Sequence, residues 1–237
     1  MTMNLFKRLE GVFFNPRETF AAIAEKPVWI DAFILLLIAV IAFSYITTPY
    51  IQQDQLEMFR DNVKLKERLG DDGFNQMIRR MENPTPASRI IQTFVTVPLA
   101  SVIGFFFSTL MLFVFGRFVS AEGRYMQVLA VLLHASFVDK LLGNAVRLIL
   151  IQSKKSVMKI STGLPLFFPD LEVTSTAYIV LSQFDFFQLW MFGVLGWGLS
   201  AVFKVDIRKG LILSYGFWLL KSLVYIGFGI LGRSFMQ

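Results

Sequence analysis

Five long apolar runs, separated by polar segments, limit what this 237-residue chain can fold into. Each run exceeds the roughly 20 residues that an α-helix needs to cross a hydrocarbon core of about 30 Å. Backbone N–H and C=O groups find no water there, so each run must satisfy them internally as a helix. We therefore predict an all-α, polytopic membrane bundle of five transmembrane helices. The predicted spans are residues 28–50, 90–116, 124–151, 177–203 and 209–232.

The composition supports a membrane protein and excludes several other classes. Charged residues make up 17% of the chain, whereas a soluble domain carries roughly 25%. The net charge of +6 is scattered, without a basic face or a nucleic-acid-binding motif, so the expected partners are the lipid bilayer and proteins rather than nucleic acid. There is no cysteine, and neither metal-ligand spacing nor a hydrolase motif occurs. We expect no catalytic residues, no cofactor and no metal.

Residues 1–27 differ in character from the membrane domain that follows, over residues 28–237. They lack the apolar core of a signal peptide. Asn15 is a favourable N-cap, Pro16 suits the first helical position, and Glu18 has the spacing of a capping box. We predict a capped amphipathic helix that lies in the cytoplasmic interface of the membrane.

The apolar side chains of this segment have two alternative roles. They could anchor the segment in the lipid interface and so orient the first span, with neighbouring cations facing anionic headgroups. They could instead form a docking surface for a partner protein. The residues predicted to form this surface are Phe13, Phe14, Asn15, Pro16, Phe20 and Ile23.

The connections alternate between long and tight, which bears on topology. Residues 52–89 hold seven acidic and seven basic residues, and we predict an extracytoplasmic helical insert broken near Gly70. The N-terminal segment and the two tight turns carry about nine Lys and Arg in some 45 residues, against about eleven in some 65 on the other side. This bias favours a cytoplasmic N-terminus and an external C-terminus.

A shift of 84 residues aligns the two tight turns, which are predicted to be cytoplasmic. Glu122 and Arg124 then fall on Asp206 and Arg208. Spans two and three would form one helical hairpin, and spans four and five a second hairpin of the same orientation. The alternative explanation is that any tight turn beside a membrane needs charged residues.

Charged side chains inside the spans indicate a second candidate site. They are costly in hydrocarbon and normally face a bundle interior or a wet cavity. At about 1.5 Å of rise per residue, they lie in the outer half of the membrane. We expect Asp185 to pair with Lys140 or Lys221. The predicted polar cluster comprises Asp139, Lys140, Asn144, Arg147, Asp185 and Lys221.

Two roles remain open for this cluster. Its charges either hold spans three to five together or form a relay or binding site for an ion or a lipid headgroup. Arg147 could alternatively extend to the outer surface. The single histidine, His134, is predicted to make an interhelical hydrogen bond, because His134, Ser136 and Asp139 share one helix and do not face one another as a catalytic triad would.

Two pairs of small residues predict close contacts between helices. Gly104 and Ser108 lie four residues apart in the second run, as do Gly196 and Ser200 in the fourth. This spacing lets helix backbones approach each other. We expect both pairs to pack inside the bundle rather than between two copies of the chain.

The N-terminal stretch NPRETFAAIAEKP, ahead of five spans joined by tight turns, resembles the Yip (Ypt-interacting-protein) family, specifically its bacterial members. The resemblance implies a five-span bundle in the bacterial cytoplasmic (inner) membrane. Eukaryotic relatives bind small Rab-type GTPases, and some bacterial relatives are tied to ABC-type export machinery. The insert over 52–89 departs from the family's minimal pattern. The resemblance rests on Asn15, Pro16, Phe20, Ile23, Lys26, Pro27, Glu122 and Asp206.

Two functions follow from these features. The first is a non-enzymatic membrane scaffold or adaptor that docks a component of an export or trafficking machinery. The alternative is a small transporter, channel or lipid-handling protein that uses the polar cluster. An adaptor should lose its partner when residues 1–26 are removed and tolerate Asp185→Asn, whereas a transporter should show the reverse.

Overall fold

A computed structural model of the chain describes residues 3–236, with side chains to residue 232, and its regular elements within this range are helices. Five helical spans are long and apolar enough to cross a membrane, which confirms the predicted fold class. The first span is α3 (Ile30–Arg60). The second consists of α5 (Pro86–Ile91), η1 (Gln92–Thr96) and α6 (Val97–Arg117), and the third of α7 (Tyr125–Ala135), η2 (Val138–Gly143) and α8 (Asn144–Lys154). The fourth and fifth are α10 (Phe186–Phe203) and α11 (Ile207–Met236).

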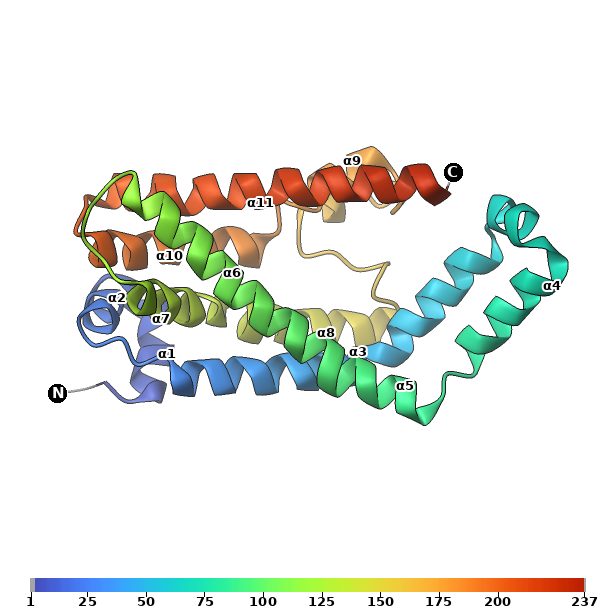
Figure 1. Ribbon diagram of the computed structural model, residues 1–237, viewed down its shortest axis with the longest axis horizontal. Helices are drawn as coiled ribbons and strands as arrows, with labels where there is room; N and C mark the ends of the chain where they lie inside the picture. The colour runs from blue at the N-terminus through green and yellow to red at the C-terminus, as the bar shows by residue number, and fades with distance from the viewer. Residues whose placement is uncertain (1–2, 237) are drawn as a thin grey trace.

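The chain places its N-terminal helices and both tight turns at one end of the bundle (Figure 1). Helices α1 (Leu5–Phe14) and α2 (Pro16–Glu25) lie at this end, while α4 (Val63–Glu82) lies at the opposite end. The two hairpins therefore run in the same direction, as the alignment of the two turns predicts. Internal duplication of the sequence stays a prediction.

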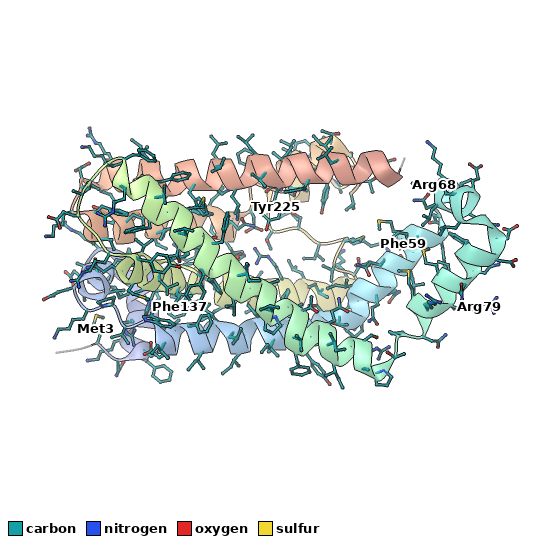
Figure 2. The ribbon with its side chains drawn as sticks, viewed as in Figure 1. Met3, Phe59, Arg68, Arg79, Phe137 and Tyr225 are labelled. Atoms are coloured by element: carbon teal, nitrogen blue, oxygen red, sulfur yellow. The ribbon has the colours of Figure 1, made fainter. Side chains whose placement is uncertain are left out.

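The third span and α10 form the centre of the bundle. In the most apolar 18-residue stretch of each span, 72% of the residues are buried in the third span but only 17% in the first. Figure 2 shows Phe137, which is fully buried, inside the bundle, whereas Arg68 and Arg79 lie on the insert. The apolar outer faces of α3, α6 and α11 are left to contact lipid.

The insert begins later than predicted because α3 continues past residue 50 as a polar helix to Arg60. Helix α4 starts after Asn62, whose side chain accepts a hydrogen bond from the backbone of Leu65 (2.9 Å). The predicted break at Gly70 is confirmed, since its φ of 69° and ψ of 166° interrupt the helix. Arg60 and Glu82 form an ion pair that ties the end of α3 to the end of α4.

The fourth span is broken, which corrects the continuous helix predicted over residues 177–203. A short helix, α9 (Thr176–Leu181), ends before α10 begins at Phe186. Asp185 causes the break because its carboxylate accepts a hydrogen bond from the backbone N–H of Gln188 (3.0 Å) and so acts as an N-cap. The backbone N–H of Phe186 donates to the carbonyl of Thr162 (3.0 Å), so the preceding connection satisfies part of the exposed backbone.

Close packing of α10 on α11 depends on small residues. A Cβ placed on Gly210 would overlap the carbonyl oxygen of Gly196 and lie 2.9 Å from the Cβ of Ser200. The packing role predicted for Gly196 and Ser200 is thus confirmed. The same prediction is wrong for Gly104, because a Cβ there would meet nothing within 4 Å.

We expect Gly210→Ala to lower the free energy of unfolding by about 1–3 kcal/mol, because the added methyl group forces α10 and α11 apart. Gly216→Ala is the matched control on the same helix, since a Cβ there meets no atom within 4 Å. It should leave stability unchanged or raise it by up to about 1 kcal/mol through helix propensity. Chemical denaturation in detergent micelles, followed by tryptophan fluorescence, measures both. Equal stability of the two variants would contradict the close packing.

Candidate functional site

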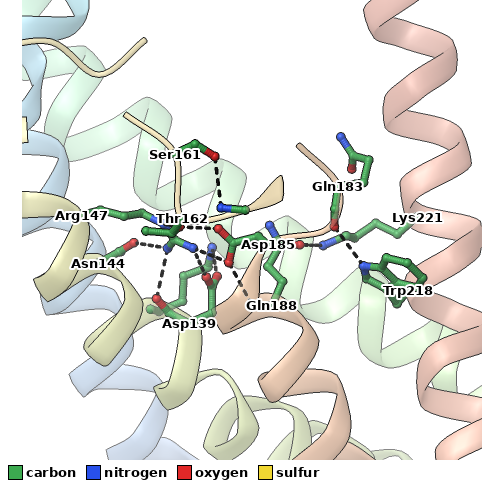
Figure 3. A network of polar contacts seen from close by, with 12 residues as sticks. Asp139, Asn144, Arg147, Ser161, Thr162, Gln183, Asp185, Gln188, Trp218 and Lys221 are labelled. Carbon is green, nitrogen blue, oxygen red and sulfur yellow. Dashed lines mark hydrogen bonds and ion pairs between the residues drawn. The ribbon is translucent and has the colours of Figure 1, made fainter. Parts of the chain in front are cut away.

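Arg147 forms the centre of the intramembrane polar cluster (Figure 3). One Nη atom lies 2.9 Å from a carboxylate oxygen of Asp139 and 2.9 Å from one of Asp185. The Nε–H donates to the hydroxyl of Thr162 (3.1 Å), and the other Nη donates to the side chain of Asn144 (3.0 Å). A single guanidinium thus connects the third span, the irregular connection between α8 and α9 (the third connection) and the start of α10.

The pairing of the remaining lysines differs from the prediction. Lys140 lies 2.9 Å from the carboxylate of Asp139, and Lys221 donates to the side-chain oxygen of Gln188 (2.7 Å). The predicted pairing of Asp185 with Lys140 or Lys221 is therefore wrong. The alternative that Arg147 reaches the outer surface is also wrong, because its side chain is only 16% exposed.

A wide π turn in the third span explains these partners. The turn η2 covers Val138–Gly143 and contains Asp139 and Lys140. It adds a residue to the helical turn and so changes which side chains before and after it share a face. Asp139 is buried and meets Arg147, although in an uninterrupted α-helix these two side chains, eight residues apart, would differ by about 80° around the helix axis. Sequence periodicity gives no sign of this turn.

Thr162 is a member of the cluster that the sequence analysis missed. Its hydroxyl donates to the carboxylate of Asp185 and accepts from Arg147. It lies on the irregular third connection, where Gly163 pairs with Asp185 in an isolated antiparallel bridge. Because this segment is neither a helix nor a strand, hydrophobic periodicity in the sequence does not predict its position. The turn-forming composition of Ser161, Thr162 and Gly163 is the only local signal.

The N-terminal helices are part of the bundle rather than a separate interfacial element. Phe20 and Ile23 are buried in the core, so they are not available as docking residues. Phe13 packs edge-on against Trp190, with ring centroids 5.8 Å apart. Of the six residues predicted to dock a partner, Phe14, at 85% exposure, is the one large apolar side chain left exposed.

Asn15 joins two helices, as the C-cap of α1 and the N-cap of α2. It ends α1, and its side chain does not cap α2, which starts at Pro16. The amide of Asn15 instead donates to the carboxylate of Glu18 (2.7 Å). The predicted helix is thus confirmed as α2, with Asn15 at its N-cap position and Pro16 as its first residue, but the predicted capping box is wrong. A bend at Asn15 folds α2 back against α7 and α10.

A second buried polar cluster, which the sequence analysis did not foresee, fixes α1 to the bundle. Arg8 is buried, forms an ion pair with Asp31 and donates to the carbonyl of Val28 (3.1 Å). It also lies 3.0 Å from Nε2 of His134. Arginine only donates, so Nε2 accepts and Nδ1 donates to the carbonyl of Ala130 (2.7 Å). The predicted interhelical hydrogen bond of His134 is confirmed.

The two tight turns lie against each other and against α2. The hydroxyl of Ser120 donates to the carbonyl of Phe203 (2.7 Å), and Lys204 lies 3.3 Å from the carboxylate of Glu122. The amide of Gln127 donates to the carbonyl of Ala24 (2.7 Å). These contacts fix three separate parts of the chain into one surface.

A groove of about 500 Å³ lies between α2 and the two tight turns. Arg124 and Glu122 line it, as do Lys204 and Glu25. Asp206 and Arg208 are outside its lining, and the carboxylate of Asp206 accepts from the backbone N–H of Arg208 (2.8 Å) instead. The first of the two predicted turn pairs is therefore better placed to meet a ligand than the second.

One protein family matches most of the chain. The Yip1 domain family model matches residues 11–229, which include the bend at Asn15, the first four spans and most of the fifth. No curated protein and no solved structure matches the chain. Among the described residues, no group of three or more His, Asp or Glu side chains is placed to hold a metal ion.

We expect Phe20→Ala to lower the free energy of unfolding by about 3–5 kcal/mol, because it leaves a cavity where α2 packs against the core. Phe14→Ala is the matched control, an exposed phenylalanine on the preceding helix, and should change stability by less than about 0.5 kcal/mol. Chemical denaturation in micelles measures both. Similar small effects would show that α2 does not belong to the cooperative core.

We expect Arg147→Met to destabilise the bundle by about 3–5 kcal/mol, because Asp185 is left buried without a cation and Asp139 keeps only Lys140. The same substitution at Arg60, whose ion pair with Glu82 is largely exposed, should cost less than about 1 kcal/mol. Adding Asp185→Asn to Arg147→Met should restore part of the loss. If the double variant is no more stable than Arg147→Met, charge pairing is not the cause.

Proposed function

We propose that this chain, which belongs to the Yip1 domain family, is a non-enzymatic scaffold that docks a partner protein at the membrane. Members of this family are multi-pass membrane proteins that act in trafficking and are generally not enzymes. The groove between α2 and the two tight turns supports this proposal most directly. It joins three parts of the chain into a single surface, whereas each part alone is too small to hold a partner.

The chemistry of the groove suits a protein segment. Small side chains such as Ala21 and Ala24 line it, and charged groups of both signs, including Glu25, Arg124 and Lys204, surround them. Protein interfaces combine a closely packed centre with a polar rim in this way. The hydrogen bonds that hold α2 and the turns together also preorganise the surface, which lowers the entropic cost of binding.

The docking residues that we propose differ from those that the sequence indicates. Phe20 and Ile23 support the groove from the core, and Phe14 and Phe118 remain exposed at this end of the bundle. Aromatic side chains are favoured at the interface between membrane and water. We therefore assign partner contact to the lining of the groove and membrane contact to the two exposed phenylalanines.

We further propose that the groove faces the cytoplasm of a bacterial cell, with the protein in the inner membrane and its C-terminus outside. The excess of Lys and Arg in the N-terminal segment and the tight turns supports this orientation. The partner would then belong to an export or trafficking machinery, and an ABC-type exporter is the bacterial example that the family resemblance suggests.

Removal of residues 1–26 would not test this proposal, because it also removes Phe20 and Ile23 from the core.

We instead expect Ala21→Trp, which fills the groove from an exposed position on α2, to abolish co-purification of a stoichiometric partner in mild detergent. Ala87→Trp, at an exposed position on α5 near the opposite end, is the control and should retain the partner. Quantitative mass spectrometry of the tagged full-length proteins compares them. Retention by Ala21→Trp would contradict docking in the groove.

A further inference from the structure

A cavity of about 610 Å³ lies between α6, α10, α11 and the π turn η2. Its polar lining includes Lys140, Lys221, Ser136 and Gln188, together with Asp139. The cavity adjoins the polar cluster, and Figure 3 shows Lys221 reaching from α11 toward Gln188. It is distinct from the docking groove, which lies at the end of the bundle beside the tight turns.

Lys221 has no anionic partner within the described part of the chain. Its ammonium donates to Gln188 and lies over the rings of Phe192 and Tyr225, at 5.3 and 5.9 Å from their centroids. None of the ion pairs among residues 3–232 includes it. An ammonium has three N–H donors, and one of them is used by Gln188. A cation at this position, inside a membrane span, requires a counter-charge.

The neighbouring carboxylates do not supply that charge. Asp139 already contacts Lys140 and Arg147, and Asp185 contacts Arg147. Three cations, including Lys221, therefore share two carboxylates, which leaves a net charge of +1. The charged residues that line the cavity are Lys140, Lys221 and Asp139, so the lining itself carries a net charge of +1.

The walls and rim of the cavity suit a ligand with an apolar part. Phe105 and Phe217 are among the aromatic residues of the wall. Gly104 and Tyr225 line the cavity and are exposed on α6 and α11, the outer helices. Because a Cβ on Gly104 would meet nothing within 4 Å, the space beside it is open. A ligand could thus enter the cavity from the lipid phase between these two helices.

We infer that this cavity binds the phosphate group of an anionic phospholipid, with Lys140 and Lys221 facing the phosphate oxygens and the acyl chains leaving past Gly104 toward the bilayer. Phosphate oxygens accept hydrogen bonds from lysine ammonium groups, which act as point charges toward them. The bound lipid supplies the missing negative charge, and its chains replace water along the apolar wall. This assignment does not depend on the scaffold function.

The test uses purified full-length protein in a neutral detergent and adds phosphatidylglycerol, phosphatidylcholine or inorganic phosphate. Native mass spectrometry counts bound lipid, and thermal unfolding measures stabilisation by each additive. We expect one tightly bound phosphatidylglycerol and a raised Tm, with little effect of phosphatidylcholine. Equal binding of the two lipids would overturn the inference of an anionic site. Stabilisation by millimolar inorganic phosphate that equals the lipid's would assign the site to a soluble phosphate and overturn the lipid.

Two variants and one control separate this site from general attraction of the surface for anionic lipid. Lys221→Gln should weaken phosphatidylglycerol binding by about tenfold or more, since it removes a charged hydrogen-bond donor. Lys209→Gln, an exposed lysine on the same helix, should not. Gly104→Leu fills the cavity without changing charge and should abolish binding while the lipid-free Tm is kept. Equal weakening by Lys221→Gln and Lys209→Gln, or full binding by Gly104→Leu, would overturn the inference.

Discussion

The guanidinium of Arg147 holds together parts of the bundle that could not otherwise coexist in a membrane. The fourth span is interrupted before Phe186, and an irregular connection enters the bundle beside it. Irregular backbone at membrane depth is tolerated only where protein satisfies its polar groups. Arg147 contacts Asp185, which caps α10, and Thr162, which belongs to that connection. The broken span, the connection and the third span therefore form one unit.

Arg8 fixes the N-terminal helices to the bundle through buried polar contacts, as Arg147 fixes the broken span. It crosses from α1 to Asp31 on α3 and to His134 on the third span, so α1 is fixed by polar contacts as well as by apolar packing. The consequence for function is direct. Because α2 follows α1 into the core, the surface left for a partner is the groove formed jointly with the tight turns, rather than one face of an amphipathic helix.

Identical sequence signals led to opposite outcomes in two helices. Gly196 lies in a close contact between α10 and α11, whereas Gly104 borders an open cavity on the lipid side of α6. A small residue allows close approach, but only the position of a neighbouring helix decides whether the approach occurs. In Figure 1, α6 crosses α11 obliquely, and the cavity lies between these helices and the polar cluster.

Four properties could be predicted from the amino-acid sequence alone: the five spans, the common end of the two tight turns, the break at Gly70 and the inward position of the charged residues. These properties follow from length, hydropathy and backbone preference, which act locally and are enforced by the hydrocarbon. Only the tertiary structure decided that Phe20 is buried, that Asp185 begins a helix and pairs with Arg147, and that Lys221 lacks a carboxylate. These outcomes depend on residues distant in sequence and on a π turn that changes helical phase, and neither leaves a periodic signal along the chain.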